Sequence, residues 1–377
     1  MTKTEKLLRE LIALPSVNPA FVPGQDSHSG EQRVADFLAA TAAQAGLDVE
    51  FQEVFPGRSN LLARLSPRGK VRQRILLAPH LDTVNATDQQ FAPETKRGRL
   101  FGRGACDTKG SIAAMLTALC ELAQGGSRPE QTEIVFAGLV DEENGQGGAR
   151  ALVRQGMKAD LAIVGEPTRL QVITAHKGSM WLRLATRGKS AHGSQPDLGR
   201  NAVHIMARVV DVLQTEYADR LRRRHHALLG CATVNVGTIS GGTQANTVPD
   251  HCSILVDRRT LPGESEAGVQ REIARVLSRR DLKATVRNEK PVACLPLETD
   301  ANVPLVARFL QSVGQRRPAG ASYFCDASVL AHGGIPSVVF GPGDIAQAHT
   351  VDEWISLDSL ERGKGLLLRF LESFSSI

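Results

Sequence analysis

The segment 132–148 constrains the fold more than any other part of the chain. It reads TEIVFAGLVDEENGQGG, and residues 134–140 are apolar apart from Gly138. Such a run is typical of a central parallel strand that is covered on both faces. Three consecutive acids, Asp141–Glu143, follow directly and precede a glycine-rich turn. A solvated acidic turn would explain this segment by itself, whereas open α/β sheets bind their ligands at the carboxyl ends of strands.

The same arrangement recurs elsewhere, which favours the second interpretation. Side chains that commonly bind metals stand just past other short apolar strands or in loops: His80 and Asp82 after the strand 74–79, Asp107 in the glycine-rich loop 101–107, Glu166 after the strand 160–164, and His349 in the segment 341–353. Taken singly, each has an ordinary explanation, such as a helix cap or a loop residue. Because the carboxyl ends of parallel strands lie at one edge of a sheet, their joint recurrence predicts a single metal site.

The types of these side chains indicate which metals the site would take. Imidazoles and carboxylates, with no thiolate, suit Zn²⁺, Co²⁺ or Mn²⁺. Five ligands exceed the four of one tetrahedral ion, so we expect two ions that share a carboxylate. Asp82 points the same way as His80 in extended backbone and can hold its imidazole. Glu142 and Glu143 point to opposite sides, so one should bind metal and the other act as base. Their spacing does not assign the two roles.

The pattern of apolar and polar residues changes twice along the chain, which predicts two domains. Its 377 residues exceed the size at which a single core stops growing. Up to about residue 173, short apolar strands alternate with amphipathic helices. The strand 180–187 then alternates apolar and polar residues and is the first element of a β-α-β-β-α-β series. After this series, short apolar strands and amphipathic helices follow again. We therefore predict a large α/β domain with a mostly parallel sheet, residues 1–173 and 286–377, and an inserted ferredoxin-like domain, residues 174–285.

Composition argues against several other classes of protein. The net charge of +5, the pI of 9.0 and the 4% of aromatic residues give little support to nucleic-acid binding. The basic run 220–226 is interpreted as a solvated helix end, with a polyanion site as the alternative. Six scattered cysteines indicate reduced thiols in a cytoplasmic protein. No stretch approaches the ~18 apolar residues of a membrane span, so we expect no membrane partner.

Eight motifs, in order along residues 75–360, carry a family resemblance. They are APHLDT, GRGACDTKG, VDEEN, VGEPT, GKSAHGSQPDLGRNA, NTVPD, DRRTLPGE and AHTVDE. Together they resemble the co-catalytic metallopeptidase family of acetylornithine deacetylase, succinyl-diaminopimelate desuccinylase and carboxypeptidase G. The sequence departs modestly from the family pattern: Thr108 stands where methionine is common, and Gly193 where serine is common after the histidine.

The resemblance implies a role for each candidate residue. The large domain would be catalytic and hold two zinc ions, with Co²⁺ or Mn²⁺ as possible substitutes. The ligands would be Asp107 between the ions, His80 and Glu166 on one, and Glu143 and His349 on the other. Glu142 would be the general base. Asp82 is a further catalytic candidate, through its hold on the imidazole of His80. The inserted domain would be a lid and dimerisation domain that supplies His192 to stabilise the oxyanion and Arg259 and Asn246 to bind the substrate's carboxylate or backbone.

The expected activity is hydrolysis of the acyl–nitrogen bond of an N-acyl amino acid. One alternative is a dipeptidase or carboxypeptidase with the same machinery, and another is a catalytically silent relative that binds a ligand or partner. The resemblance favours a homodimer in which His192 serves the neighbouring subunit. The residues alone leave this open, because a hinge between the two domains could also bring His192 into the site of its own chain. The strand carrying Val234, Val236 and Ile239 is a candidate sheet edge, which could pair with a second copy.

Overall fold

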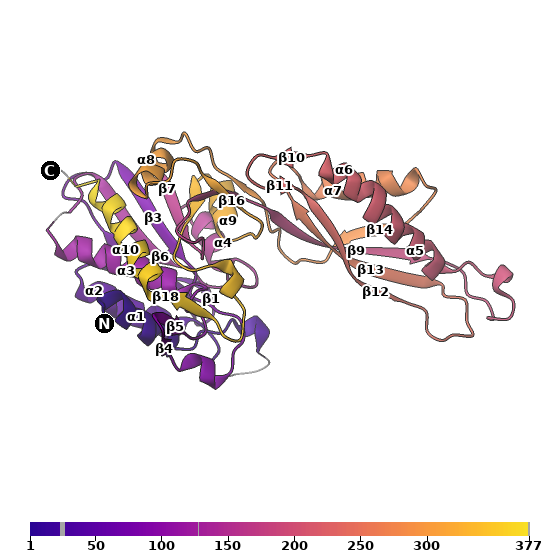
Figure 1. The fold of residues 1–377 in the computed structure, drawn as a ribbon, viewed down its shortest axis with the longest axis horizontal. Coiled ribbons are helices and arrows are strands. Elements are labelled where there is room, and N and C mark those ends of the chain that lie inside the picture. The colour runs from indigo at the N-terminus through magenta and orange to yellow at the C-terminus, as the bar shows by residue number, and fades with distance from the viewer. Residues whose placement is uncertain (23–26, 127, 376–377) are drawn as a thin grey trace. The chain divides into compact units, whose positions relative to one another are not determined.

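The computed structural model describes residues 1–22, 27–126 and 128–375, and the chain forms two compact units (Figure 1). Unit 1 comprises residues 1–174, 299–319 and 325–377, and unit 2 comprises residues 175–298 and 320–324. The segment 286–298 thus lies in unit 2. Both units match the predicted fold class, a large α/β domain with a second domain inserted into its sequence.

The sheet of unit 1 is parallel at its centre and antiparallel towards its edges. Its order is β1-β2-β6-β3-β7-β17-β8, and β6, β3, β7 and β17 run parallel. The bounds are β1 Asp48–Phe55, β2 Arg58–Leu65, β3 Gln73–Pro79, β6 Thr132–Gly138, β7 Leu161–Gly165, β8 Ile173–His176 and β17 Ser337–Val339. The central position of β3 places the segment after it beside the segments that follow β6 and β7.

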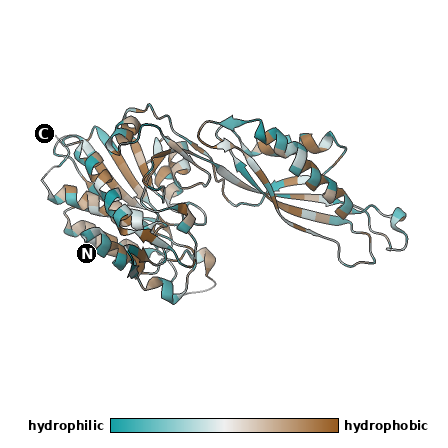
Figure 2. Cartoon of the chain, viewed as in Figure 1, coloured by the Kyte–Doolittle hydropathy of each residue, from teal (hydrophilic) through white to brown (hydrophobic). Residues whose placement is uncertain are grey.

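Helices cover both faces of this sheet, which explains the apolar runs of its strands. In β6, Ile134 and Phe136 belong to the main core, whereas Val135 and Ala137 point the other way and are equally buried. The main core contains side chains of α1 (Lys3–Ile12), α2 (Gln32–Gln44), α3 (Lys109–Gln124), α8 (Pro304–Ser312) and α10 (Leu357–Glu372). On the other face, α9 (Ala327–His332) packs on β7, β17 and α4 (Gly147–Arg154). Hydrophobic residues accordingly concentrate in the strands (Figure 2).

Unit 2 has the predicted ferredoxin-like topology. Its elements are β9 (Gly178–Arg187), α5 (Ala202–Val212), β12 (Thr233–Gly241), β13 (His251–Thr260), α7 (Glu266–Ser278) and β14 (Thr285–Asn288). All pairs of the sheet β12-β13-β9-β14 are antiparallel. The cap residues Asn201 and Ser265 accept backbone N–H groups in the first turns of α5 and α7, which fixes where both helices begin. Strand β12 lies at one edge of the sheet, as predicted.

Several short elements have no clear signal in the sequence. They are a π-helical turn (Leu213–Tyr217) that leads into α6 (Ala218–Arg222), the pair β10 (His225–His226) and β11 (Gly230–Cys231), β15 (Leu297–Glu298), β16 (Ala319–Ala321), and a small sheet of β4 (Glu94–Lys96), β5 (Arg99–Phe101) and β18 (Trp354–Ser356). In that small sheet Trp354 pairs with Phe101, so β18 brings the segment after His349 next to the loop that carries Asp107.

Acidic neighbours compensate the basic run at the end of α6. Arg220 and Arg224 form ion pairs with Glu272, and Arg222 pairs with Asp219. These contacts are those of a solvated helix end. Within the described residues, no helix combines the length and apolar character that crossing a membrane requires.

Candidate metal centre

Neighbouring strands of the unit 1 sheet bring the predicted ligands together. His80 follows β3, the acids 141–143 come shortly after β6, and Glu166 follows β7. Strand β3 is bonded to β6 on one side and to β7 on the other, with all three parallel, so these segments leave the sheet at the same edge. Two loops complete the site: Asp107 precedes α3, and His349 follows the short 3-10 helix Ile345–Gln347.

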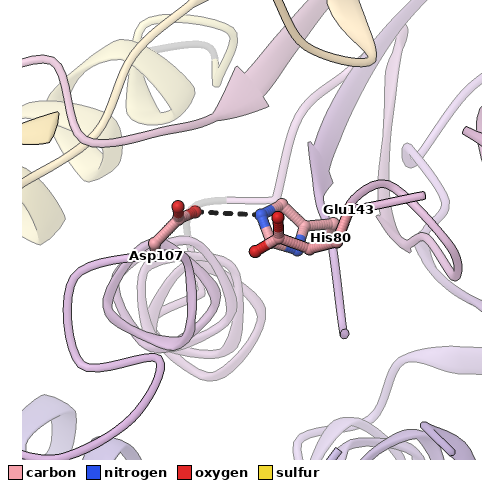
Figure 3. Close-up of side chains that lie close together, drawn as sticks. All are labelled: His80, Asp107 and Glu143. Atoms are coloured by element: carbon pink, nitrogen blue, oxygen red, sulfur yellow. Dashed lines mark hydrogen bonds and ion pairs between the residues drawn. The ribbon is translucent and has the colours of Figure 1, made fainter. Parts of the chain in front are cut away.

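Asp107 lies between the two histidines. Its Oδ1 is 3.1 Å from His80 Nε2, and its Oδ2 is 3.4 Å from His349 Nε2. Figure 3 shows the carboxylate of Asp107 facing the side chains of His80 and Glu143, with a dashed line from Asp107 to His80. The helix-cap explanation for Asp107 is not met, because the residue before α3 is Thr108 and Asp107 points to the imidazoles. Each oxygen of one carboxylate thus faces a different ring nitrogen.

Each histidine also has a second acid beside it. Glu166 Oε1 is 3.9 Å from His80 Nε2, and Glu143 Oε2 is 3.1 Å from His349 Nε2. Ligand atoms at the usual zinc distances around a tetrahedral ion are about 3.3 Å apart. His80, Glu142 and Glu166 also offer atoms that lie within 4.8 Å of one another, as do His80, Asp107 and Glu143. The donor set therefore fits two divalent ions. Glu142 and Glu143 both lie close enough to the other donor atoms to act as ligands.

Asp82 does more than the sequence predicts. The Nδ1 atom of His80 lies 3.0 Å from the backbone carbonyl of Asp82 and 3.4 Å from its Oδ1. The carboxylate itself accepts the backbone N–H groups of Glu142 at 3.1 Å and Glu143 at 3.0 Å. It thus connects the segment after β3 to the acidic segment after β6. The buried side chain of Asp82 therefore fixes the backbone of both glutamates as well as the imidazole.

Three residues that the sequence analysis missed hold the same acidic segment. Asn18 donates from Nδ2 to Asp82 Oδ2 at 2.7 Å and to Asp141 Oδ1 at 3.0 Å. Glu31 accepts the backbone N–H of Asp141 at 3.1 Å and is itself paired with Arg58. Asp141 has φ +69°, a left-handed conformation that is uncommon outside glycine and costs free energy. The network stabilises this turn. Its members come from three separate segments, and no local pattern marks them.

The charges of the site favour bound cations. Burial raises the pKa of Glu142 and of Glu166 well above the usual range, and the charge of Glu166 adds to the effect on Glu142. Burial also raises the pKa of Glu143. Hydrogen bonds to Asp107 and Glu143 raise the pKa of His349 to about 10. Buried acids at this density repel one another, and a divalent cation among them would offset the repulsion.

Thr108 and Gly193 have structural explanations. Thr108, which is fully buried, donates from its hydroxyl to the backbone carbonyl of His80 at 3.1 Å. A Cβ atom on Gly193 would lie 2.9 Å from backbone atoms of Asn246, closer than such contacts occur. The Gly193 N–H also donates to the Asn246 carbonyl at 2.7 Å. The glycine therefore permits the close approach of these two loops.

The three predicted site residues of unit 2, one catalytic and two substrate-binding, lie on one sheet and its loops. His192 pairs with Thr247 in a backbone bridge, which brings it next to Asn246. The exposed imidazole of His192 accepts the backbone N–H of Ser194 at Nδ1, 3.2 Å away. A neutral imidazole that accepts at Nδ1 carries its proton on Nε2, so Nε2 is a donor. Arg259, on β13, donates from Nε to Asp257 Oδ2 at 3.0 Å.

Asp326 is a buried acid beside the centre that the sequence analysis also missed. It stands directly before α9, and its side chain is 1% exposed. Neither carboxylate oxygen has a hydrogen-bond partner within the part of the chain that the structure describes. Burial raises the pKa of Asp326 to about 7, and the charge of Asp82 contributes. The sequence CDAS gives no sign of this environment.

We expect Asp326→Asn to stabilise the metal-free protein increasingly as pH rises. The unfolded pKa is about 3.9, so the folded protein binds this proton more tightly and loses stability between about pH 4 and pH 7. Asparagine has the same shape and no charge. Urea unfolding should show the variant gaining about 2–3 kcal/mol on the parent between pH 5 and pH 8. An equal difference at both pH values would contradict the assignment.

Comparison with known proteins gives the family. Residues 76–373 match the family described as Peptidase family M20/M25/M40. The chain belongs to this family. As an M20 peptidase it is a hydrolase that acts on amide bonds, and the resemblance drawn from the eight motifs is confirmed. Similar proteins include the acetylornithine deacetylases of Proteus mirabilis (strain HI4320), 30% identical over 98% of this chain and 96% of the relative, and of Myxococcus xanthus, 32% identical over 90% and 91%.

Solved structures of M20 peptidases share the fold. Aminopeptidase PepT from Bacillus cereus ATCC 10987 superposes with a TM-score of 0.79 at 23% identity, covering 99% of this chain and 98% of its own. The Bacillus subtilis YxeP protein, described as a dinuclear metal binding peptidase of this family, gives a TM-score of 0.72 at 14% identity, covering 98% and 97%. At identities this low, the superpositions show that the fold is shared. They do not identify the substrate.

Proposed function

We propose that this M20 peptidase is a two-metal amidohydrolase that cleaves the acyl–nitrogen bond of an N-acyl amino acid. One observation supports this most: the two oxygens of Asp107 face two different histidines, each with its own further acid. Asp107 would hold both ions, His80 and Glu166 one of them, and Glu143 and His349 the other. Zinc is the expected metal, with cobalt or manganese as substitutes, because the ligands are imidazoles and carboxylates.

Glu142 would serve as the general base. When bound at this centre, two divalent ions would polarise a substrate carbonyl as Lewis acids and would lower the pKa of bound water. Glu142 offers a carboxylate close to His80 and Glu166. Burial raises the pKa of the Glu142 carboxyl, which favours its acceptance of a proton. It would accept the proton of the attacking water and return it to the departing amine.

His192 would stabilise the oxyanion that forms when water attacks. A donor aimed at this developing charge is the usual means of lowering such a barrier, and Nε2 of His192 carries a proton in the tautomer that its contact with Ser194 selects. We propose that His192 serves the site of a second subunit in a homodimer. The exposed side of the edge strand β12, which includes Ile239, is the candidate contact between the copies.

The substrate class follows from the relatives and from unit 2. Both curated relatives described above are acetylornithine deacetylases, so small N-acetyl or N-succinyl amino acids are the first substrates to test. Arg259 and Asn246 would bind the substrate's carboxylate or backbone. The cytoplasm is the proposed compartment, since all six cysteines are free thiols. Amino-acid biosynthesis is the proposed role, because the similar proteins are acetylornithine deacetylases.

Replacing Arg259 with lysine should separate two classes of substrate. A guanidinium binds a carboxylate with two parallel hydrogen bonds, and an ammonium does not. We expect KM to rise at least about tenfold for substrates with a free carboxylate and much less for their amides. Arg183→Lys is the matched control, because Arg183 is also on the unit 2 sheet and paired with an acid, Glu289. An equal rise in KM for both substrate classes would contradict carboxylate binding by Arg259. The role left for this residue would be its ion pair with Asp257.

A hydrolysis screen tests the proposed function. N-acetyl amino acids, N-succinyl amino acids and dipeptides are offered to the protein loaded with Zn²⁺ and, separately, with Co²⁺. Release of free amine from the acylated amino acids is the expected result. Hydrolysis of dipeptides alone would assign the chain as a dipeptidase or carboxypeptidase. No hydrolysis of any substrate, with both ions bound, would favour the catalytically silent relative.

A further inference from the structure

Glu353 lies beneath the metal centre with its carboxylate fully engaged. It is 1% exposed. Its Oε1 accepts the backbone N–H groups of Cys106 at 2.8 Å and Asp107 at 2.9 Å. Its Oε2 accepts the backbone N–H of Gly104 at 3.0 Å and Nη1 of Arg103 at 2.7 Å. Four donors therefore converge on one carboxylate, and three of them belong to the backbone of the loop that ends at Asp107.

The same residue is tied to the other loop of the centre. Glu353 stands four residues after His349 and directly before β18. Its backbone carbonyl accepts the N–H of Gly102 at 3.0 Å, and β18 continues the contact by pairing with β5. Glu353 and Asp107 are 246 residues apart in the sequence. The side chain thus joins two distant segments, each of which carries one of the proposed metal ligands.

We propose that Glu353 is a positioning residue that sets the place of Asp107 relative to His349 and thereby the affinity of the centre for metal. The inference rests on the proposed function. Because a hydrogen bond to the Asp107 N–H fixes the backbone from which the shared carboxylate projects, losing it should weaken both ions rather than one. His349 has φ +61°, so its loop is held in a conformation that non-glycine residues seldom adopt. A contact four residues away helps to maintain it.

The chemistry of the side chain makes the role testable with a small change. An ionised carboxylate is an acceptor at both oxygens, whereas glutamine accepts at one and donates at the other. In Glu353→Gln the amide NH₂ must face either the N–H groups of Cys106 and Asp107 or those of Gly104 and Arg103. Donors would then oppose donors in a buried space, although the shape of the side chain is kept.

Zinc affinity is the measurement that decides. The dissociation constants of both ions are obtained from the holoenzyme by competition with a zinc chelator, at a temperature well below unfolding. We expect Glu353→Gln to bind both ions at least about tenfold more weakly, the loss typical when a partner of a metal ligand is removed. The matched control is Glu133→Gln. Glu133 is a buried acid of unit 1 paired with Arg74, at the opposite end of β6 from the centre. It should change zinc affinity less than about twofold.

The thermal unfolding of the metal-free proteins separates positioning from stability. A residue that only stabilises the fold would lower the unfolding temperature and leave the zinc affinity of the folded protein unchanged, and that result would overturn the proposal. A loss confined to one ion would also overturn it. If Glu353→Gln does not fold, Glu353→Asp, which keeps the charge on a shorter arm, is measured in the same way, and unaltered affinity would again count against the role.

The wild-type protein distinguishes this inference from the function on which it rests. Two bound zinc ions in the wild type and equal affinity in Glu353→Gln would reject the positioning role alone. A wild type that binds no zinc would reject the two-metal function and the positioning role together. Two ions in the wild type with a parallel loss of both in the variant supports the two proposals at once.

Discussion

Replacing Glu142 with alanine is expected to lower kcat by roughly 10²–10⁴-fold while the protein keeps both metal ions. The reason is that alanine removes the proposed base but leaves Asp107, His80, Glu166, Glu143 and His349 in place. Glu142 is half-buried beside His80 and Glu166, and desolvation raises the pKa of its carboxyl. The measurements are kcat on the best substrate of the screen and metal content after dialysis.

Glu143→Ala is the control for this prediction. Glu143 contacts His349 at 3.1 Å, and its backbone N–H is held by the same carboxylate of Asp82 that holds Glu142. The two variants therefore change neighbouring residues of the same turn and differ in the side chain removed. We expect Glu143→Ala to lose one ion. If Glu142→Ala loses an ion and Glu143→Ala does not, the two roles are exchanged, which the group formed by His80, Glu142 and Glu166 would explain.

His192→Ala should lower kcat by about 10²–10³-fold with metal content unchanged. His192 belongs to unit 2 and every proposed metal ligand belongs to unit 1, so its removal leaves the centre itself intact. The loss should fall on kcat rather than KM, because an oxyanion exists in the transition state and not in the bound substrate. Ser194→Ala is a milder variant. It loses the hydroxyl that lies 2.7 Å from His192 Nδ1 but keeps the backbone N–H at 3.2 Å, so the variant should retain most of the activity.

A mixture of two inactive variants tests whether His192 acts on the neighbouring subunit. His192→Ala and Glu142→Ala are combined in equal amounts under conditions that exchange subunits. Half of the dimers are then mixed, and each pairs an intact His192 with an intact centre in the other chain once. About a quarter of the wild-type activity should return. With exchange verified by labelled subunits, an activity no higher than that of the separate variants would exclude service between subunits.

The sequence by itself determined the fold class and the order of the main helices and strands. Apolar runs such as 134–140 have to be buried on both faces of a sheet, whereas the alternation in 180–187 requires a sheet with one face open to solvent. The spacing of apolar residues therefore separates the two domains. Polar residues directly after such strands, like His80 and Glu166, could be assigned to one edge because parallel strands end together. Both inferences depend only on residues close together in the sequence, so they can be made without the structure.

Only the tertiary structure decided which atoms meet. Asp107 offers one oxygen to each histidine because two loops, one carrying Asp107 and the other His349, lie side by side. Contacts with distant segments of the chain hold these loops in place. Asp82 binding the backbone of the glutamates, Asn18 joining two acids, and Glu353 holding the Asp107 loop are contacts between segments tens to hundreds of residues apart. A buried carboxylate such as Asp326 looks like any surface acid in the sequence, because burial and partners belong to the packing of distant segments and leave no periodic trace.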